Sequence, residues 1–597
     1  MCGISGILNF KIKDGNSLLD LQKNFNRDLK HRGPNNSDIW HDENNYCYLG
    51  HTRLSILDLS NKGNQPMVDR DKKFVISFNG EIYNFKEIRE TLISSGVRLT
   101  SSSDTEILLE GFKIFGKSFI QHLDGMFAFA IYDIEEQKLY IYRDRAGEKP
   151  LYYVYNENLF AFSSEFKSLL NLKNIVNFSI SNQSIFEFLA LRYIPNEKTV
   201  FNEIQKLEPG CFIEISNKDN IQIKRYFSFN VYPEERSDKK ELHELIDKVR
   251  CILKKSIYNR LNSDVPLGMF LSGGIDSSLT SSIVTKDFNR NLNTFSIGFE
   301  NYNTSEHHYA KNISQQIGSN HNEIILTNID VLENFENIGH IMDELNGDRS
   351  LIPTYLISKF AKEKVTVALS GDGADELFGG YPRHWELANK YNSYKKEYNP
   401  DKILETYLGY FLPYYNVFDL KKLDKSLYEK LIGQFNKHYL HEYRSIPSST
   451  REFDFNSYLQ IVLSKVDNAS MKNSLEVRTP YLNNELIQIA SELPDQILFN
   501  GRFPKLILRI ILDNYISKEI TTLPKKGFGL PIQNFSFFKE NQMSLYNESI
   551  ETLKNINFFK SDHLLINFIK DNSLKNYNSL WGLFAMAKWF ESLDLNL

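Results

Sequence analysis

Two short segments carry residue types that could perform chemistry. Near the start of the chain, Cys2 precedes the small residue Gly3. Far downstream, residues 271–278 read Leu-Ser-Gly-Gly-Ile-Asp-Ser-Ser. A thiol can act as a nucleophile, and a loop rich in glycine and serine can approach and bind a phosphate. The sequence therefore offers one candidate for covalent catalysis and one candidate for phosphate binding.

Cys2 gains a second reactive group if the initiator Met1 is removed, because it then carries a free α-amine beside its thiol. The reference pKa values are about 8.5 for the thiol and about 7.7–8.0 for the amine. The amine can therefore take the thiol proton directly or through water, as in enzymes with an N-terminal threonine. The alternative is that Cys2 is a small apolar residue without a catalytic role.

An amide attacked by a thiolate develops an oxyanion, which needs two preset hydrogen-bond donors. The side chain of Asn79 and the backbone N–H of Gly80 follow the expected strand 74–78 and could supply them. The alternative is that Asn-Gly forms a common hairpin turn. A free amino acid as substrate also needs a cation and an anion. Arg53 could bind its carboxylate, and Asp104 its ammonium together with Glu81; the alternatives are a surface ion pair for Arg53 and a helix N-cap for Asp104.

The segment 271–278 is expected to follow a strand and to open a helix, where backbone N–H groups and the helix N-terminus favour an anion. It lacks the lysine of the Gly-x-x-x-x-Gly-Lys-Ser/Thr loop. The alternative is a glycine turn with a serine or aspartate helix cap. A second, acidic loop at 369–381 follows a later strand. Carboxylates at that position can bind Mg²⁺ with phosphates, so Asp276 and Asp375 are the metal candidates. Asp372 and Glu376 are expected to position substrate or water; ordinary turns are the alternative, and the calcium-loop spacing is not met.

These residues need two different frameworks to position them. The first part of the chain has short apolar runs at 74–78, 126–132 and 139–142 and a helical segment at 104–115, which indicates an α+β unit dominated by strands. Polar stretches at 216–220 and 233–240 predict a boundary, with domains at 1–212 and 232–597. Beyond it, strands at 267–271, 294–299, 322–326 and 365–369 alternate with helices from about 276, at 305–317 and at 353–361. This alternation predicts a parallel sheet that binds ligands at its carboxyl edge, covered by helices and loops up to the end of the chain.

Composition narrows the class of protein. The 597 residues carry a formal net charge of −5, which argues against a nucleic-acid-binding protein driven by bulk charge. Four widely spaced cysteines show no zinc-ligand spacing and fit a reducing compartment. The sequence shows no signal peptide and no run of about 18 apolar residues. A cytoplasmic protein that acts on small molecules, without nucleic acid or membrane partners, is expected.

The N-terminal motifs together resemble a known family. Met-Cys-Gly-Ile at 1–4, His-Arg-Gly-Pro at 31–34, Arg-Leu-Ser-Ile at 53–56, Asn-Gly-Glu-Ile-Tyr-Asn at 79–84 and Asp-Gly-Met-Phe-Ala at 124–128 are similar to the class II, N-terminal-nucleophile glutaminase domain. The resemblance implies a layered αββα fold, in which the cysteine forms a glutamyl thioester and releases ammonia. It implies functional roles for six residues: Cys2, Arg53, Asn79, Gly80, Glu81 and Asp104.

The Ser-Gly-Gly-x-Asp-Ser motif resembles the pyrophosphate loop of the ATP pyrophosphatase superfamily, whose members cleave ATP between the α and β phosphates and adenylate a substrate. A lone lysine on a helix is ordinarily solvated, but Lys505 matches that family's Gly-x-x-x-Lys pattern and is implied to neutralise the leaving pyrophosphate. Segments 464–471, 474–480 and 526–531 also look like family segments, with no role beyond shaping the site. The resemblance implies these contacts to ATP or pyrophosphate: Leu271, Ser272, Gly273, Gly274, Asp276, Ser277, Ile297, Ser370, Gly371 and Lys505.

Over nearly its whole length the chain resembles the glutamine-hydrolysing asparagine synthetase family. The resemblance implies that ATP and Mg²⁺ activate the aspartate side-chain carboxylate as an acyl-adenylate, which ammonia released by Cys2 then attacks. Asp372 stands where some members have glutamate, and the bulky Arg349 in the acceptor region 343–350 departs from the pattern. Another carboxylate acceptor, such as a uronic-acid sugar or a peptide, therefore stays open, as does a non-catalytic scaffold. Cys2 argues against the β-lactam synthetases, which have lost the nucleophile. A homodimer is expected by analogy.

Overall fold

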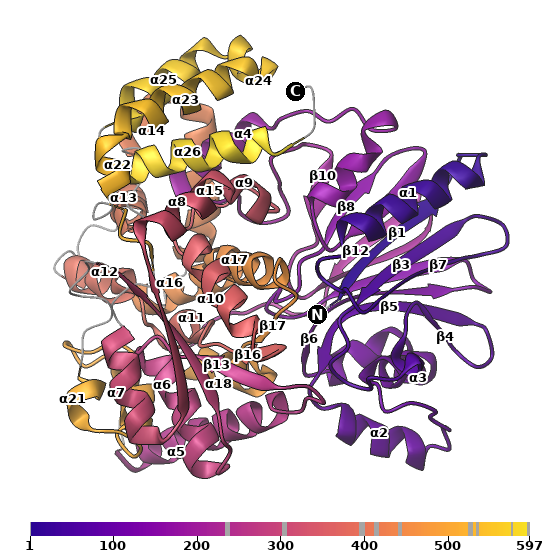
Figure 1. The fold of residues 1–597 in the computed structure, drawn as a ribbon, viewed down its shortest axis with the longest axis horizontal. Helices are drawn as coiled ribbons and strands as arrows, with labels where there is room; N and C mark the ends of the chain where they lie inside the picture. Colours follow the sequence, from indigo (N-terminus) through magenta and orange to yellow (C-terminus); the bar gives the residue numbers. More distant parts are fainter. Residues whose placement is uncertain are drawn as a thin grey trace.

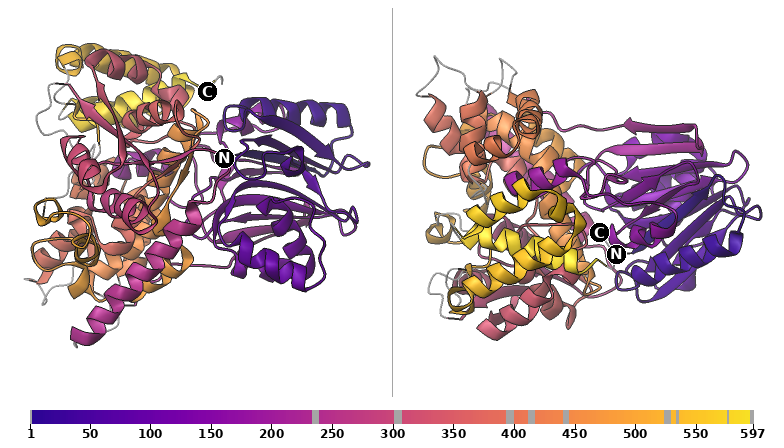
Figure 2. Two further views of the ribbon diagram at one scale, coloured as in Figure 1. Left: turned by 60° about the horizontal axis from the view of Figure 1, so that its bottom comes forward. Right: turned by 90° about the horizontal axis from the view of Figure 1, so that it is seen from above.

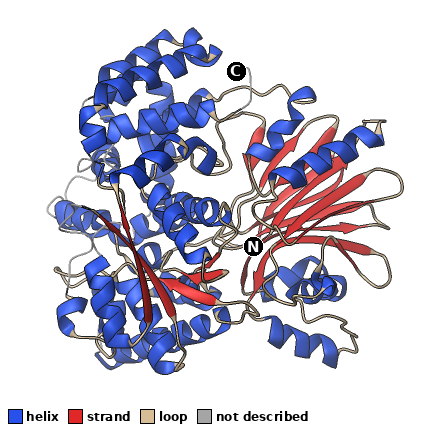
Figure 3. Ribbon diagram, viewed as in Figure 1, coloured by secondary structure: helices blue, strands red, loops and turns tan. Residues whose placement is uncertain are grey.

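The computed structural model describes residues 2–232, 239–300, 307–392, 400–410, 417–439, 445–522, 529–532, 536–574 and 577–593. Met1, the expected helix start at residue 305 and residues 526–528 of one family segment lie outside these ranges. Two units stand side by side, one rich in strands and one rich in helices (Figures 1 and 3). Both further views show the same two units adjoining each other, with the start of β1 where they meet (Figure 2). Among the described residues, no helix combines the length and the apolar character needed to cross a bilayer.

The N-terminal unit contains two six-stranded antiparallel sheets. The first has the order β10 (Ile204–Lys206), β8 (Tyr152–Tyr155), β9 (Leu159–Ser163), β1 (Gly3–Asn9), β3 (Cys47–Arg53), β2 (Asn36–His41). The second has the order β12 (Asn220–Arg225), β11 (Cys211–Asn217), β7 (Lys138–Arg143), β6 (Gly125–Asp133), β5 (Phe74–Ile82), β4 (Met67–Val68). Three helices flank the sheets: α1 (Gly15–Asp28), α2 (Phe85–Ser94) and α3 (Asp104–Phe115). Because α1 covers the first sheet while α2 and α3 cover the second, the unit has the predicted αββα layers.

The strand β6 shows why both faces of the second sheet are buried. Phe127, Phe129 and Ile131 pack in the cluster beneath α2 and α3. Their neighbours Ala128 and Ala130 pack in the cluster between the two sheets. Successive side chains of a strand point to opposite faces, so a strand buried on both sides reads as a continuous apolar run.

The expected domain end at residue 212 is wrong, because it falls inside β11. That strand pairs with β7 on one side and with β12 on the other, so the sheet continues to Arg225. The polar run that predicted a linker is the turn of the β11–β12 hairpin, where Asn217 pairs with Asn220. A polar tight turn and the start of a linker have the same composition, and only strand pairing separates them.

The C-terminal unit is built around a five-stranded parallel sheet of order β15 (Asn320–Leu326), β14 (Asn293–Phe299), β13 (Leu267–Phe270), β16 (Val367–Leu369), β17 (Glu476–Arg478). The predicted strands are confirmed, and β17 was not predicted because three residues carry no periodic pattern. The order reverses between β13 and β16, which opens a crevice at their carboxyl ends. Helices beside this sheet include α5 (Lys239–Arg260), α6 (Ile275–Ser282), α7 (His307–Ile317) and α10 (Leu351–Lys362).

Most of the remaining chain is helical, as predicted, and gathers around the parallel sheet (Figures 1 and 3). One group packs α8 (Asn328–Glu336) against the final helix α26 (Tyr577–Glu591), where the rings of Phe335 and Phe584 stack at 3.6 Å. The other helices of this part are α9 (Ile338–Ile341), α11 (Ala374–Phe378), α12 (Pro382–Asn392), α13 (Pro400–Tyr410), α14 (Val417–Leu423), α15 (Lys425–Tyr439), α16 (Ile446–Phe453), α17 (Leu459–Met471), α18 (Asn484–Glu492), α19 (Asp495–Leu498), α20 (Leu506–Leu512), α21 (Lys518–Thr521), α22 (Ser536–Glu540), α23 (Gln542–Asn555), α24 (Asn557–Ser561) and α25 (His563–Ser573). Helix α4 (Asn182–Leu191) of the N-terminal unit reaches into this layer and packs on α14 and α15.

Candidate active sites

Cys2 is partly buried immediately before β1, and its backbone is held from two sides. The Cys2 N–H donates to Asn79 Oδ1 at 3.1 Å, and Arg32 Nε donates to the Cys2 carbonyl oxygen at 3.1 Å. Burial raises the pKa of the Cys2 thiol, while the nearby amino terminus and the Leu54 backbone act in the opposite direction. The fold therefore holds the main chain of Cys2 in place through Asn79 and Arg32.

Asn79 and Gly80 lie within β5 rather than after a strand, so the hairpin-turn alternative is wrong. The strand continues through Gly80, which pairs with Phe127 of β6. The two strands approach so closely here that a Cβ atom at position 80 would lie 2.1 Å from the Met126 carbonyl oxygen. Asn79 is fully buried, and its Nδ2 has no hydrogen-bond partner among the described residues. A buried donor without a partner is costly, and a bound molecule that placed an oxygen beside this amide would remove that cost.

Arg53 is 5% exposed and lies at the end of β3. Its Nη1 donates to the Ser60 carbonyl oxygen and to Asn64 Oδ1, both at 2.8 Å, and its Nη2 donates to the Asp58 carbonyl oxygen. The alternative of a surface ion pair is therefore wrong, because Arg53 is buried and its partners here are carbonyl and amide oxygens. The guanidinium instead holds the loop that follows β3, and a ligand carboxylate has to share this group with the loop.

Asp104 is the first residue of α3, and the N-cap is Ser103, whose side chain accepts from the Thr105 N–H at 3.1 Å. Asp104 Oδ2 accepts from the Ile82 N–H at 3.0 Å. Burial raises the pKa of Asp104 to about 6, with a further contribution from Glu476. Glu81 Oε1 lies 3.2 Å from Arg478 Nη2, and burial raises the pKa of Glu81 despite that cation.

Glu476 and Arg478 come from β17 of the other unit, and the sequence predicted no chemical role for them. Arg478 Nε donates to Glu476 Oε1 at 2.7 Å, and its Nη1 donates to the carbonyl oxygens of Arg260 and Asn262 at 2.8 and 2.6 Å. Three buried carboxylates, those of Asp104, Glu81 and Glu476, thus interact electrostatically around one guanidinium. An ammonium group bound among them would reduce their mutual repulsion.

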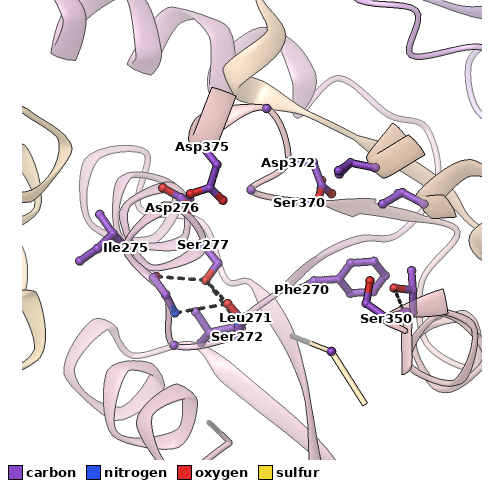
Figure 4. Close-up of a pocket in the computed structure, with 18 of the residues that line it drawn as sticks. Phe270, Leu271, Ser272, Ile275, Asp276, Ser277, Ser350, Ser370, Asp372 and Asp375 are labelled. Atoms are coloured by element: carbon purple, nitrogen blue, oxygen red, sulfur yellow. Dashed lines mark hydrogen bonds between the residues drawn. The ribbon is translucent and has the colours of Figure 1, made fainter. Parts of the chain in front are cut away.

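The second candidate site is a cavity of about 850 Å³ at the carboxyl edge of the parallel sheet. Every residue expected to contact ATP, the metal or the acceptor lines it, including Ile297 of β14. Figure 4 labels seven of them: Leu271, Ser272, Asp276, Ser277, Ser370, Asp372 and Asp375. Gly274 precedes α6 and has no side chain, so the helix-cap alternative is wrong. Gly273 adopts φ 84°, a conformation that favours glycine, and Ser272 Oγ lies 3.2 Å from Ser277 Oγ. The loop therefore presents backbone N–H groups and hydroxyls at the start of a helix.

Asp276, Asp375 and Lys505 meet in this cavity. Lys505 Nζ lies 2.5 Å from Asp276 Oδ2 and 2.6 Å from Asp375 Oδ1. Burial lowers the pKa of Lys505, but the two carboxylates outweigh it and hold that pKa above its usual value. The idea of a solvated lysine on a helix is wrong, because Lys505 is 4% exposed and precedes α20 in a left-handed conformation, φ 55°.

The acceptor candidates Asp372 and Glu376 line the same cavity. Tyr381 donates its hydroxyl to Glu376 Oε1 at 2.7 Å, and burial together with Asp375 raises the pKa of Glu376 to about 7. Asp348 and Lys465 also line the cavity, although no role is predicted for either residue individually. Arg349 is not among the cavity-lining residues within the described ranges; its carbonyl oxygen accepts from the Leu530 N–H at 3.3 Å.

The chain matches two families along consecutive stretches. Residues 1–227 match the family described as "Glutamine amidotransferase domain", and residues 248–591 match the family described as "Asparagine synthase". The chain is 30% identical to "Asparagine synthetase [glutamine-hydrolyzing] 1" of Bacillus subtilis, over 99% of this chain and 96% of that protein. It is 37% identical to "Putative asparagine synthetase [glutamine-hydrolyzing] 2" of Methanocaldococcus jannaschii, over 64% of this chain and 76% of that protein. It is 27% identical to "Asparagine synthetase B [glutamine-hydrolyzing]" of Escherichia coli, over 88% of this chain and 82% of that protein.

The second match covers more than half of the chain, and the first covers the unit that contains Cys2. The order of the two matches is also the order of the two candidate sites along the chain. This protein therefore belongs to the asparagine synthase family and carries an N-terminal glutamine amidotransferase domain.

Proposed function

We propose that this chain is a glutamine-hydrolysing asparagine synthetase that makes asparagine, glutamate, AMP and pyrophosphate from aspartate, glutamine, ATP and water. The observation that supports this best is that the expected synthetase residues converge on one cavity, while a second site beside Cys2 holds a buried amide donor without a partner. A synthetase without a glutaminase would not account for the buried Asn79 amide beside Cys2, and a glutaminase alone would not account for the second cavity. We take the glutaminase domain to extend to Arg225 and the synthetase domain to begin with α5 at Lys239.

In the glutaminase site, removal of Met1 would free the α-amine of Cys2 to accept the thiol proton. The thiolate attacks the side-chain amide carbon of glutamine, and the oxyanion accepts from Asn79 Nδ2 and the Gly80 N–H. The carbon–nitrogen bond breaks, and ammonia leaves with the proton that the amine had taken. Water then hydrolyses the thioester to glutamate and restores the thiol. Arg53 and the carboxylates of Glu81 and Asp104 are assigned to the two charged groups of glutamine.

In the synthetase site, an oxygen of the aspartate side-chain carboxylate attacks the α-phosphorus of ATP. The bond from that phosphorus to the bridging oxygen breaks, and pyrophosphate leaves with the electron pair. Residues 272–277 and Lys505 are assigned to stabilising its charge. Ammonia attacks the acyl carbon, and the nitrogen loses a proton. The bond from the acyl carbon to the phosphate oxygen breaks, and AMP leaves with its electron pair. A neutral nucleophile is required, because ammonium has no lone pair to donate.

Asp276 and Asp375 would hold Mg²⁺, which supplies positive charge to the phosphates when it is bound. The donor set fits this ion, because the two carboxylates already converge on one cation, the Lys505 ammonium. Within the described ranges there is no cluster of three or more acidic, histidine or cysteine ligands. Mg²⁺ usually binds through one or two carboxylates together with substrate phosphates and water, so two protein ligands suffice.

A coupled assay tests the proposal. With glutamine, aspartate and Mg·ATP, we expect asparagine, glutamate and AMP in equal amounts, and the intact mass of active protein should lack Met1. ATP cleavage that depends on another carboxylate, with no asparagine from aspartate, would refute the assignment of the acceptor. The cytoplasm, where thiols stay reduced, is the compartment that we propose for this enzyme. A homodimer is also proposed, and light scattering should then give twice the mass of one chain.

A further inference from the structure

We propose that the synthetase domain supplies part of the glutamine site: Arg478 positions Glu81 for the α-ammonium of glutamine, and segment 260–264 holds the loop that Arg53 contacts. This inference rests on the proposed function, because it concerns the amide donor that Cys2 hydrolyses. It goes beyond that function in making the recognition of glutamine depend on residues outside the glutaminase domain.

The Arg478 guanidinium is fully buried and is held by hydrogen bonds within its own domain. Its Nε donates to Glu476 Oε1 at 2.7 Å, and its Nη1 donates to the carbonyl oxygens of Arg260 and Asn262 at 2.8 and 2.6 Å. Its backbone is fixed as well, because β17 pairs with β16 in the parallel sheet. These bonds leave Nη2 directed at the glutaminase domain, where it lies 3.2 Å from Glu81 Oε1.

Glu81 depends on this cation for its orientation. It is 6% exposed, and within the part of the chain that the structure describes its one ion pair is with Arg478. Burial raises the pKa of Glu81, and Arg478 is the strongest influence that opposes this rise. A carboxylate accepts through two oxygens, so Glu81 can face Arg478 through Oε1 and accept an ammonium through Oε2. Without the guanidinium, Glu81 would lose its fixed direction and its neutral form would be favoured.

The charges around Arg478 suit an ammonium ligand. Glu81, Asp104 and Glu476 are three buried carboxylates, and one guanidinium can neutralise only part of their charge. Asp104 lies near Glu81, since its Oδ2 accepts from the Ile82 N–H at 3.0 Å. The ammonium of glutamine would compensate the remaining charge, and Arg478 holds the carboxylates together before glutamine binds.

The synthetase domain also holds the loop that Arg53 contacts. Asp58 donates its backbone N–H to Asp264 Oδ2 at 3.0 Å, and the Asp58 carbonyl oxygen accepts from Arg53 Nη2. Asp264 belongs to segment 260–264, in which the carbonyl oxygens of residues 260 and 262 accept from Arg478. One short segment of the synthetase domain is therefore joined to the residues assigned to both charged groups of glutamine.

Two analogues of glutamine separate its charged groups. Glutaramate lacks the α-ammonium of glutamine, and 4-aminobutanamide lacks its α-carboxylate, while both keep the amide that Cys2 attacks. In ammonia release by the full-length protein, Arg478→Gln should lower kcat/KM for glutamine and for 4-aminobutanamide by about tenfold or more and leave that for glutaramate unchanged. The loss should come mainly from a higher KM for glutamine at unchanged kcat, because the ammonium is remote from the reacting amide.

A double-mutant cycle shows whether Arg478 acts through Glu81. Glu81→Gln alone should raise the KM for glutamine, and adding Arg478→Gln to it should have little further effect, because the carboxylate that Arg478 positions is already absent. If Arg478→Gln does not fold, Arg478→Lys keeps the buried charge without the fork that reaches several acceptors, and the same pattern is expected at a smaller size. Fully additive losses in the double variant, or equal losses with glutamine and glutaramate in the single Arg478 variant, would overturn the inference.

Asp264→Ala tests the second contact at an exposed residue, where folding is not at risk. It should lower kcat/KM for glutamine and for glutaramate by about threefold or more and leave that for 4-aminobutanamide unchanged, since it frees the loop that Arg53 contacts. Lys86→Met is the matched control, because it removes another contact to the same segment, from Lys86 Nζ to Asn262 Oδ1 at 2.8 Å, and should change none of these values. An Asp264→Ala variant that behaves like Lys86→Met would contradict the role of segment 260–264.

Ammonia-dependent synthesis of asparagine separates recognition from folding. It should stay at the wild-type level in the Arg478, Asp264 and Lys86 variants, because none of these side chains lines the synthetase cavity. If the wild-type protein releases no glutamate from glutamine at all, the proposed function fails instead, so the two failures are distinguishable.

Discussion

Arg32 and Asp467 form an ion pair, closed off from solvent, that joins the two domains: Arg32 Nη1 lies 2.8 Å from Asp467 Oδ2. The same guanidinium donates to the Cys2 carbonyl oxygen through Nε, and its Nη1 donates to Glu165 Oε1 at 3.1 Å. Asp467 lies on α17, two residues after Lys465 of the synthetase cavity. One helix, α17, therefore contacts Arg32, which holds the backbone of Cys2, and also lines the cavity of the second site.

Replacing Asp467 should affect the two half-reactions unequally. Asp467→Asn leaves the buried Arg32 with one fewer carboxylate, and breaking a buried pair in this way costs about 3–5 kcal/mol of stability. We expect glutamine-dependent synthesis to fall at least about tenfold while ammonia-dependent synthesis changes little, because Arg32 holds Cys2. Urea unfolding gives the free energy, and parallel assays with glutamine and with ammonium give the ratio. An equal fall with both nitrogen sources would contradict this role.

Asn79 should act mainly through its unpaired amide. Asn79→Ala removes one oxyanion donor, and losses of about 10²–10³ in kcat are typical of such changes. The measurement is the rate of glutamate release at saturating glutamine. Gly80→Ala is a different test of the same strand, because its Cβ would lie 2.1 Å from the Met126 carbonyl oxygen and should destabilise the fold itself. A kcat near the wild-type value in a folded Asn79→Ala variant would remove Asn79 from the oxyanion site.

Glutamine use should depend on the ionisation of Asp104. Burial raises its pKa to about 6, and only the carboxylate form can bind an ammonium. The glutaminase kcat/KM should therefore fall as the pH is lowered through about 6, since this parameter reports the free enzyme. Bound glutamine should shift the corresponding limb of kcat to lower pH, because its ammonium favours the ionised form. A flat kcat/KM between pH 5 and 7, or the same limb in Asp104→Asn, would contradict the assignment.

Lys505 should be needed for adenylation and not for glutamine hydrolysis. Lys505→Met removes the cation between Asp276 and Asp375 and the charge assigned to the leaving pyrophosphate. We expect ATP–pyrophosphate exchange with aspartate to fall by about 10² or more, by analogy with the loss of other preset charge-stabilising groups. Basal glutaminase activity without ATP is the matched control and should persist. Unchanged exchange in a folded variant would exclude Lys505 from the phosphate site.

Local patterns in the sequence predicted much of this structure. The helix expected at 104–115 is α3, and the apolar runs at 126–132 and 139–142 are β6 and β7. The position of residues 271–278 between a strand and a helix was also predicted correctly, because the segment and its two neighbouring elements are consecutive along the chain. The pairs Arg32–Asp467 and Glu81–Arg478 join residues about 400 positions apart, and no local pattern encodes such contacts. The sequence predicts that the strand ends before Asn79 and Gly80, and Asn-Gly alone favours a turn. In the structure β5 continues through both residues, because its pairing with β6 outweighs this local preference.

The most direct test of the account follows one nitrogen atom. The protein is incubated with glutamine labelled with ¹⁵N in its side-chain amide, aspartate and Mg·ATP, and the products are identified by mass spectrometry. We predict asparagine with ¹⁵N in its amide and one AMP for each asparagine. Cys2→Ala should make no asparagine from glutamine but should still make it from ammonium. Asparagine without the label, or labelled asparagine from Cys2→Ala, would contradict the account.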